Sequence, residues 1–363
     1  MNKDLPYIVS FDKIQGLGSV KLLAIYKYFK SFKNAWDSDI NEFKNISVIN
    51  NTNLQEIQKF KSFFSPLDYY QKILDSNINV ITILDDNYPF LLKNIPDPPF
   101  VLYYKGIWKD DIIKNSIAIV GTRKPSHSGR KAAYNFSRDL SSFNINIVSG
   151  MANGIDAEVH KGCLSVNKYN TAVLGCGVDI IYPSTNRKIY EQLIENGLIL
   201  SSYPPGTNPD PRNFPPRNRI ISGLSSAVIV IEAGEKSGTL ITVDYANEQG
   251  RDVFVMPGDI FNPASKGTNN LIKQGANVIT EISDVLNYLN WNINFEDKNH
   301  SLKKINLTET EKIIYDNLDY NPKHIDNIVY DLNMPLSEIS SILIMLEIKE
   351  LVKQLPGNLF LKV

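Results

Sequence analysis

The sequence has few cysteines and no excess charge of one sign. Cys163 and Cys176 are too few for a framework of disulfides, and their spacing is not that of a zinc site, as expected of a protein from a reducing compartment. The 38 lysines and arginines are balanced by 39 aspartates and glutamates, and the formal net charge is -1. Overall charge therefore cannot bring a polyanion to this protein, and any such binding must be local.

Long hydrophobic runs are also missing. No stretch approaches the ~18 apolar residues of a membrane-spanning helix, and the first residues lack the charged and apolar regions of a signal peptide. We therefore expect a cytoplasmic protein with no membrane partner. The 363 residues, 43% of them hydrophobic and 21% charged, have an ordinary globular composition that allows two or three domains.

The N-terminal third predicts helices followed by a connector. Within residues 1–80, apolar residues between Val20 and Phe32 recur at every third or fourth position. The preceding Ile14-Gln-Gly-Leu-Gly18 resembles half of a helix-hairpin-helix motif, whose backbone amides can hold a DNA phosphate. A tight turn between packed helices is the simpler interpretation. Residues 81–111 are rich in proline and predict an extended connector.

Residues 112–290 alternate short β-branched runs with helix-length segments. Unbroken apolar runs indicate strands buried on both faces of a parallel sheet, and the intervening helices predict a doubly wound, Rossmann-like α/β domain. The expected strands are Ile117–Val120, Ile145–Val148, Thr171–Leu174, Leu198–Ser201, Ala227–Ile231, Val253–Met256 and Asn277–Ile279, and the expected helices are Gly129–Ser142, Asp156–Ser165, Arg187–Asn196, Thr239–Gly250 and Thr268–Gln274.

After a polar linker at residues 291–307, residues 308–363 predict three helices and a hairpin, the pattern of a winged helix. This segment carries 5 basic and 9 acidic side chains, whereas residues 112–290 carry 17 and 15. A winged helix usually reads duplex DNA with its third helix, and an excess of negative charge opposes that contact. Protein contact or regulation is the preferred role for this segment.

Glycine is concentrated where the predicted strands end, the usual ligand side of a doubly wound sheet. These glycines predict a groove lined by loops that can face phosphates. The common nucleotide motifs fail, because Gly175-Cys-Gly177 lacks a third glycine and Gly234–Gly238 lacks the spacing of a Walker A loop. The four histidines form no metal-binding set. We therefore expect no cofactor, no metal and no catalytic residue.

The densest basic segment, residues 208–223, combines three arginines with one phenylalanine and with Asn218, which suits a base edge or a sugar. Guanidinium groups suit phosphates and an aromatic ring suits a base, whose stacking is worth ~1–3 kcal/mol. In the structural alternative, Phe214 packs at a helix start and Arg219 pairs with an acidic residue such as Glu232. The further basic residues Arg123, Lys124 and Lys266 on the same rim favour binding.

Several motifs follow one another along residues 85–290: Ala118–Pro125, Val148–Ala157, Ala172–Asp179, Ser202–Gly206, Asn213–Gly223, Ser237–Thr242 and Asn262–Asn269. Together they closely resemble the DNA-processing protein A (DprA/Smf) family. The resemblance implies a non-enzymatic protein of natural transformation that binds single-stranded DNA, forms homodimers through its α/β domain and loads the RecA recombinase. It also implies a sterile-alpha-motif-like N-terminal domain, which residues 1–80 match only loosely.

The resemblance and the basic segment together predict a DNA-binding groove. One departure is Asn153, which replaces a frequent arginine and removes one possible phosphate contact. The residues expected to contact or shape the groove are Gly121, Arg123, Lys124, Gly150, Gly154, Gly175, Gly177, Arg212, Phe214, Arg217, Asn218, Arg219, Ser237, Gly238, Thr239 and Lys266.

Two other functions stay open. The α/β superfamily includes phosphoribohydrolases of the LOG type, which cleave nucleoside monophosphates with a glutamate, but Thr242 occupies that position and a hydroxyl cannot stabilise the developing positive charge as a carboxylate can. Alternatively, residues 308–363 bind duplex DNA and the protein is a regulator.

Overall fold

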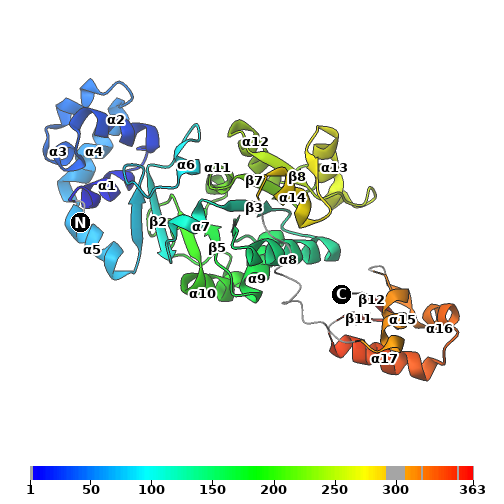
Figure 1. Ribbon diagram of the computed structural model, residues 1–363. Helices are drawn as coiled ribbons and strands as arrows, with labels where there is room; N and C mark the ends of the chain where they lie inside the picture. The colour runs from blue at the N-terminus through cyan, green and yellow to red at the C-terminus, as the bar shows by residue number, and fades with distance from the viewer. Residues whose placement is uncertain (1–2, 292–306, 320–321, 350, 363) are drawn as a thin grey trace. The chain divides into compact units, whose positions relative to one another are not determined.

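The computed structural model describes residues 3–291, 307–319, 322–349 and 351–362. The chain forms two compact units, Met1–Asn292 and Ile293–Val363 (Figure 1). In the first unit, a continuous sheet joins the predicted α/β domain to the segment that precedes it.

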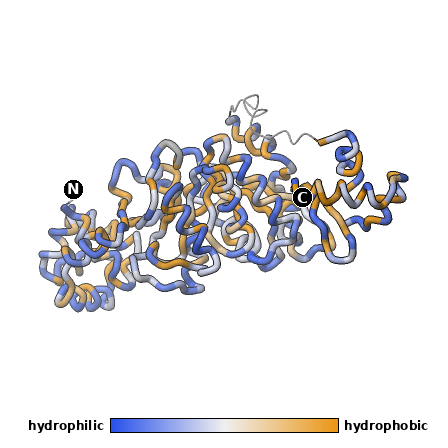
Figure 2. Tube along the Cα trace, turned by 90° about the horizontal axis from the view of Figure 1, so that it is seen from below, coloured by the Kyte–Doolittle hydropathy of each residue, from blue (hydrophilic) through white to orange (hydrophobic). Residues whose placement is uncertain are grey.

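The N-terminal unit is built on a nine-stranded sheet with the order β1-β2-β6-β5-β4-β3-β7-β8-β9. Strands β3 to β9 pair in parallel, which confirms the doubly wound fold. Their hydrophobic runs form the orange stretches in the middle of the unit in Figure 2. The parallel strands are β3 (Ser116–Val120), β4 (Asn146–Ser149), β5 (Asn170–Val173), β6 (Leu198–Ser201), β7 (Ala227–Val230), β8 (Asp252–Val255) and β9 (Asn277–Val278).

Helices cover both faces of this sheet, α11 and α12 on one and α8, α9 and α10 on the other (Figure 1). All five predicted helices are present, but α11 was not predicted. Its first turn contains Pro215 and Pro216, which interrupt a helical pattern in the sequence although proline is tolerated where the amides have no intrahelical partner. The bounds are α8 (His127–Ser142), α9 (Ile155–Ser165), α10 (Arg187–Asn196), α11 (Phe214–Gly223), α12 (Thr239–Glu248), α13 (Lys266–Lys273) and α14 (Ile282–Tyr288).

The proline-rich segment is more than a connector, and here the sequence prediction was wrong. Strand β2 (Val101–Gly106) pairs antiparallel with β6, and β1 (Asn79–Thr82) pairs with β2, so the segment extends the sheet by two strands. The short helices α6 (Phe90–Lys93) and α7 (Asp110–Ile113) flank β2. The prolines precede β2 and leave its amides free to pair.

The N-terminal helices share one core with the sheet. Phe11, Phe32 and Phe43 are fully buried in the same hydrophobic cluster as Tyr103 of β2. The segment Ile14–Gly18 turns into α2 with Gly16 at a φ of 85°, and it packs as a tight turn, the simpler of the two interpretations. These elements are α1 (Leu5–Asp12), α2 (Ser19–Phe29), α3 (Phe32–Asp37), η1 (Ile40–Asn45), α4 (Asn51–Phe63) and α5 (Pro66–Asp75).

The C-terminal unit is the predicted winged helix, with a small sheet of order β10-β12-β11. Within the described residues no single helix is long and apolar enough to cross a membrane; α16 and α17 meet that test only as a pair, with a bend of 116° between them. The elements are α15 (Glu309–Asn317), β10 (Lys323–His324), α16 (Ile325–Leu332), α17 (Leu336–Ile348), β11 (Val352–Leu355) and β12 (Leu359–Lys362).

The junction between helices and sheet contains a buried acid. The Tyr103 hydroxyl of β2 donates a hydrogen bond to Asp12 Oδ2 of α1 at 2.8 Å. Burial raises the pKa of Asp12 from 3.8 to about 7, although the Tyr103 hydrogen bond lowers it in part. The folded protein therefore holds a proton on Asp12 that the unfolded chain releases above about pH 4.

The first prediction concerns this proton. The stability contributed by protonated Asp12 is complete below about pH 4, falls as the pH rises to about 7 and is lost above it. Asp12→Asn keeps an acceptor for Tyr103 and removes the charge. Urea unfolding at pH 5 and pH 8 should therefore show a smaller loss of stability in the variant than in the native protein. Equal losses would contradict a raised pKa.

Candidate nucleic-acid interface

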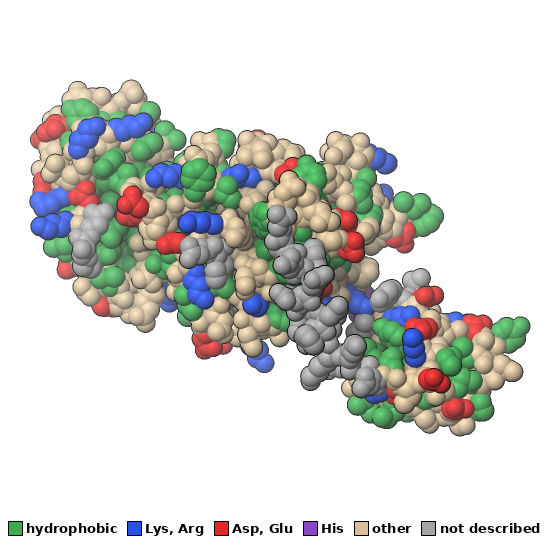
Figure 3. Space-filling model, viewed as in Figure 1, with side chains coloured by type: hydrophobic (Ala, Val, Ile, Leu, Met, Phe, Trp, Pro, Cys, Tyr) green, Lys and Arg blue, Asp and Glu red, His purple; other side chains and the backbone are tan. Residues whose placement is uncertain are grey.

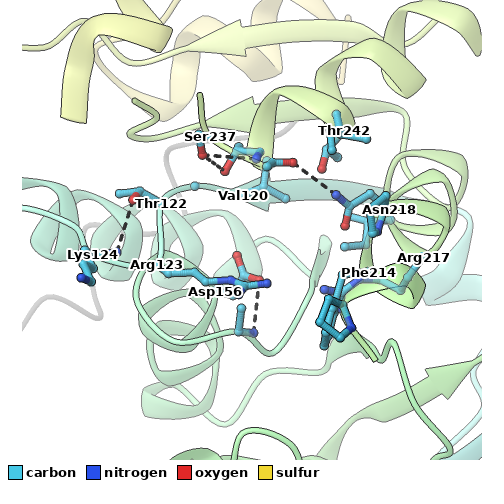
Figure 4. A pocket seen from close by; sticks show the side chains of 18 of the residues that line it. Val120, Thr122, Arg123, Lys124, Asp156, Phe214, Arg217, Asn218, Ser237 and Thr242 are labelled. Atoms are coloured by element: carbon cyan, nitrogen blue, oxygen red, sulfur yellow. Dashed lines mark hydrogen bonds between the residues drawn. The ribbon is translucent and has the colours of Figure 1, made fainter. Parts of the chain in front are cut away.

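A groove of about 620 Å³ opens at the carboxyl ends of β3 and β7, where the strand order reverses. In doubly wound sheets this is the position at which ligands bind. Figure 4 shows Arg123 and Lys124 on one side of the groove, Phe214 and Asn218 of α11 on another, and Ser237 near the start of α12. The predicted residues that line it are Gly121, Arg123, Lys124, Phe214, Arg217, Asn218, Ser237, Gly238 and Thr239.

The loop after β3 presents two cations. Arg123 and Lys124 are exposed at the groove. Two glycines allow the loop to pack closely on the start of α9: a Cβ at Gly121 would lie 2.5 Å from a side-chain carbon of Ile155, and a Cβ at Gly154 would lie 2.5 Å from the backbone oxygen of Thr122. Gly154 also has a φ of 86°, which favours glycine. These two glycines therefore shape the groove.

Phe214 is the centre of a cluster of cations and rings. The guanidinium carbons of Arg123 and Arg217 lie 5.5 Å and 5.6 Å from the centre of its ring. A Cβ at Gly175 would lie 2.8 Å from Cδ1 of Phe214, so only glycine leaves room for the ring. Phe214 thus contacts the neighbouring loops while it lines the groove.

Arg217 lies in the floor of the groove and is almost fully shielded from solvent. Its side chain is buried, and Nη1 donates to the backbone oxygens of Gly150, at 2.6 Å, and Val173. A Cβ at Gly150 would lie within about 3 Å of this guanidinium. The prediction that Arg217 meets a phosphate is therefore corrected: this arginine joins the ends of β4 and β5 in the floor of the groove.

A buried carboxylate accompanies Arg217. Asp156 of α9 is 7% exposed and accepts a hydrogen bond from the backbone amide of Ala152 at 3.3 Å. Burial raises the pKa of Asp156, and the positive charge of Arg217 partly offsets the rise. The floor therefore combines one buried cation with one buried acid and adds little net charge to the groove.

Several backbone amides of the rim already have partners. The amide of Thr122 donates to the backbone oxygen of Glu232 at 2.7 Å, that of Lys124 to the Thr122 hydroxyl, and that of Thr239 to the Ser237 hydroxyl. The glycines at the strand ends predict loops that hold phosphates by their amides. Because several of these amides are engaged, side chains are the main polar groups that face the groove. One of them is Asn218, whose amide group also donates to the Gly238 oxygen.

Some predicted residues lie outside the groove. Arg219 points to the opposite side of α11 and contacts Asp97, whose carboxylate is 3.5 Å from Nη2. It thus pairs with an acidic residue, as in the structural alternative, but with Asp97 and not with Glu232, which was given as an example. Arg212 is 89% exposed and pairs with Asp210 at 2.7 Å. The predicted residues not among those lining the groove are Gly150, Gly154, Gly175, Gly177, Arg212, Arg219 and Lys266.

Two residues that line the groove or hold its rim, Tyr182 and Glu232, were not predicted as site residues. Tyr182, 43% exposed, lines the groove 5.7 Å from Phe214, measured between ring centres. Glu232 is buried and accepts hydrogen bonds from the Ser126 amide at 2.8 Å and the Asn262 side chain at 3.0 Å, so it connects two rim loops. Tyr182 precedes a proline after a glycine-rich strand end, a signal that could have placed it at the rim.

The charged side chains on the surface are of both signs (Figure 3). On the face of the N-terminal unit in Figure 3, lysines and arginines are scattered among acidic and neutral side chains. In the C-terminal unit, Lys349 follows α17, and its Nζ is 2.6 Å from the Glu311 carboxylate. Helix α17, the third helix of this unit, exposes Ile344, Met345 and Ile348. Its surface is poorly suited to phosphates.

A family model described as DNA recombination-mediator protein A matches residues 79–290, more than half of the chain. The chain belongs to the DNA recombination-mediator protein A family. A second model, described as a DprA winged helix domain, matches residues 301–358. The matches confirm the resemblance to DprA/Smf proteins and the winged-helix fold.

Relatives cover most of the chain. Protein Smf of Synechocystis is 40% identical over 288 residues, 78% of this chain and 72% of the relative, and Protein Smf of Escherichia coli is 33% identical over 84% of this chain and 83% of the relative. Among solved structures, DNA processing protein A of Streptococcus pneumoniae aligns with a TM-score of 0.69 and 34% identity, covering 78% of this chain and 97% of that one.

A second solved relative is DNA processing protein A from Helicobacter pylori, whose structure is described as giving insights into a unique single-stranded DNA binding mode. It aligns with a TM-score of 0.53 and 32% identity, and the alignment covers 59% of this chain and 97% of the relative.

The second prediction separates the two arginines that lie over Phe214. Arg217→Ala removes the donor of two buried carbonyls and the stronger of the two positive charges that act on Asp156, and should cost about 2–4 kcal/mol of stability. Arg123→Ala removes an exposed side chain and should change stability by less than about 0.5 kcal/mol. Urea unfolding measures both. Equal losses would show that Arg217 has no special structural role.

Proposed function

We propose that this protein binds single-stranded DNA in the groove at the ends of β3 and β7 and passes the strand to a recombinase of the RecA type during natural transformation. The observation that supports it most is the cluster at the groove, where an exposed arginine lies over an aromatic ring. Cations beside aromatic rings suit the phosphates and bases of an unpaired strand.

The groove favours single strands over duplex. Its rings must reach the flat faces of bases, which a duplex keeps stacked inside the helix. Few side chains at the groove are suited to reading base edges, and Asn218 already donates to a backbone oxygen. We therefore expect binding that depends little on sequence.

The RecA partner, the homodimer and the cytoplasmic location are proposals that rest on family membership. The homodimer has one further support: β9 ends the nine-stranded sheet, and Val278 on this strand is 47% exposed. An open edge of this kind can pair with a second copy.

We propose a binding role without catalysis. The LOG-type alternative needs a carboxylate that faces the substrate. Glu232 is buried with both oxygens engaged, and Thr242, which lines the groove, offers only a hydroxyl.

The third prediction is a titration of the full chain with fluorescent oligo-dT and with duplex of equal length. Binding to oligo-dT should be tighter and should weaken as salt rises, because phosphate contacts release counterions. Arg123→Ala should weaken binding about tenfold for every sequence and reduce the salt slope by about one. Arg138→Ala, which removes an arginine paired with Asp139 far along α8, is the matched control. Equal affinity for duplex and single strand would overturn the proposal.

The fourth prediction concerns the winged helix. Because the N-terminal helices share a core with the sheet, the shortest suitable fragment is residues 1–291 and not the α/β segment alone. This fragment should keep the oligo-dT affinity of the full chain to within about threefold. Complete loss of binding would assign DNA recognition to the C-terminal unit.

A further inference from the structure

The Phe214 ring is partly buried and has close neighbours. Both guanidinium groups described above lie over it, Arg123 at 5.5 Å and Arg217 at 5.6 Å from its centre. One edge packs on the backbone of Gly175, where even a methyl group would not fit. A base that stacked on a face of Phe214 occupied by a guanidinium group would have to displace that group, and Arg217 is fixed by buried hydrogen bonds.

Tyr182 offers the surface that Phe214 lacks. Its side chain is 43% exposed, and its ring plane is inclined by 33° to that of Phe214. It lines both the groove and a smaller hollow of about 50 Å³, which Arg123 and Asn153 also line. The ring thus lies at the junction of two open spaces.

The loop that carries Tyr182 is held in place. Asn186 donates a hydrogen bond to the Met151 oxygen at 2.8 Å, and the Thr185 hydroxyl donates to Asn153 Oδ1 at 2.8 Å. Both bonds join this loop to the one after β4. A fixed ring loses little conformational entropy when a ligand stacks on it.

We propose that Tyr182 is the ring on which a base of the bound strand stacks, and that Phe214 supports it from behind while Arg123 contacts the adjoining phosphate. The ligand is any unpaired nucleotide, because every base has a face that can stack. This inference rests on the proposed function and goes beyond it by assigning base contact to a residue that neither the charge pattern nor the basic segment indicated.

The test compares two ligands on the full chain. One is fluorescent oligo-dT, and the other is an oligomer of equal length whose sugars carry no bases. Tyr182→Leu should weaken binding to oligo-dT about 5- to 150-fold, the range expected for one stacked base, and leave binding to the abasic strand unchanged. Tyr182→Phe keeps the ring and should keep the affinity.

Tyr288→Leu is the matched control, since Tyr288 is 50% exposed and contacts Asp252 at the amino end of β8. Equal losses on both ligands for Tyr182→Leu would show that Tyr182 only shapes the groove, and an unchanged oligo-dT affinity would show that it makes no contact. Either result overturns the inference. If the native protein bound neither ligand, the proposed function itself would fail, which the native titration alone reveals.

Discussion

The groove depends on the buried guanidinium of Arg217. By donating to Gly150 and Val173, this group joins the ends of two parallel strands and occupies the space beneath Phe214. A buried arginine is costly unless its donors are satisfied, and here backbone carbonyls and the nearby Asp156 offset part of that cost. The need for glycine at position 150 follows from it, because a Cβ at Gly150 would come too close to the guanidinium.

The residues around the groove therefore fall into two groups with different roles. Arg217, Glu232 and the glycines hold the rim loops, whereas Arg123, Lys124 and Tyr182 remain exposed to a ligand. Residues of both groups belong to the same motifs. A motif match alone therefore does not separate a residue that contacts DNA from one that positions its neighbours.

The parallel strands and their connecting helices could be predicted from the sequence, because unbroken β-branched runs are long enough to identify buried strands. The helix α11 could not, since Phe214-Pro-Pro has the composition of a turn. Strand β2 was not predicted for a related reason. The prolines before Val101 suggest an extended connector, and only tertiary pairing with β6 makes the segment part of the sheet.

The location of the groove could be predicted from the sequence, and so could some of the residues that line it. Glycines at strand ends indicate the rim, but the direction of each arginine on α11 depends on helix phase: Arg217 turns inward and Arg219 turns to Asp97. Because α11 was not predicted, the sequence did not show which of the three arginines of this segment turns inward. The second ring was not predicted because Tyr182 and Phe214 are far apart in sequence and come into contact only in the folded chain.

The most direct test of the central claim is to map where DNA touches the protein. An oligonucleotide containing 5-iodouracil, bound to the full chain and irradiated, attaches to side chains in contact with its bases, and peptide mapping locates the attachment. We predict attachment at Tyr182, in the groove at the ends of β3 and β7. Attachment confined to residues 307–362 would contradict the account.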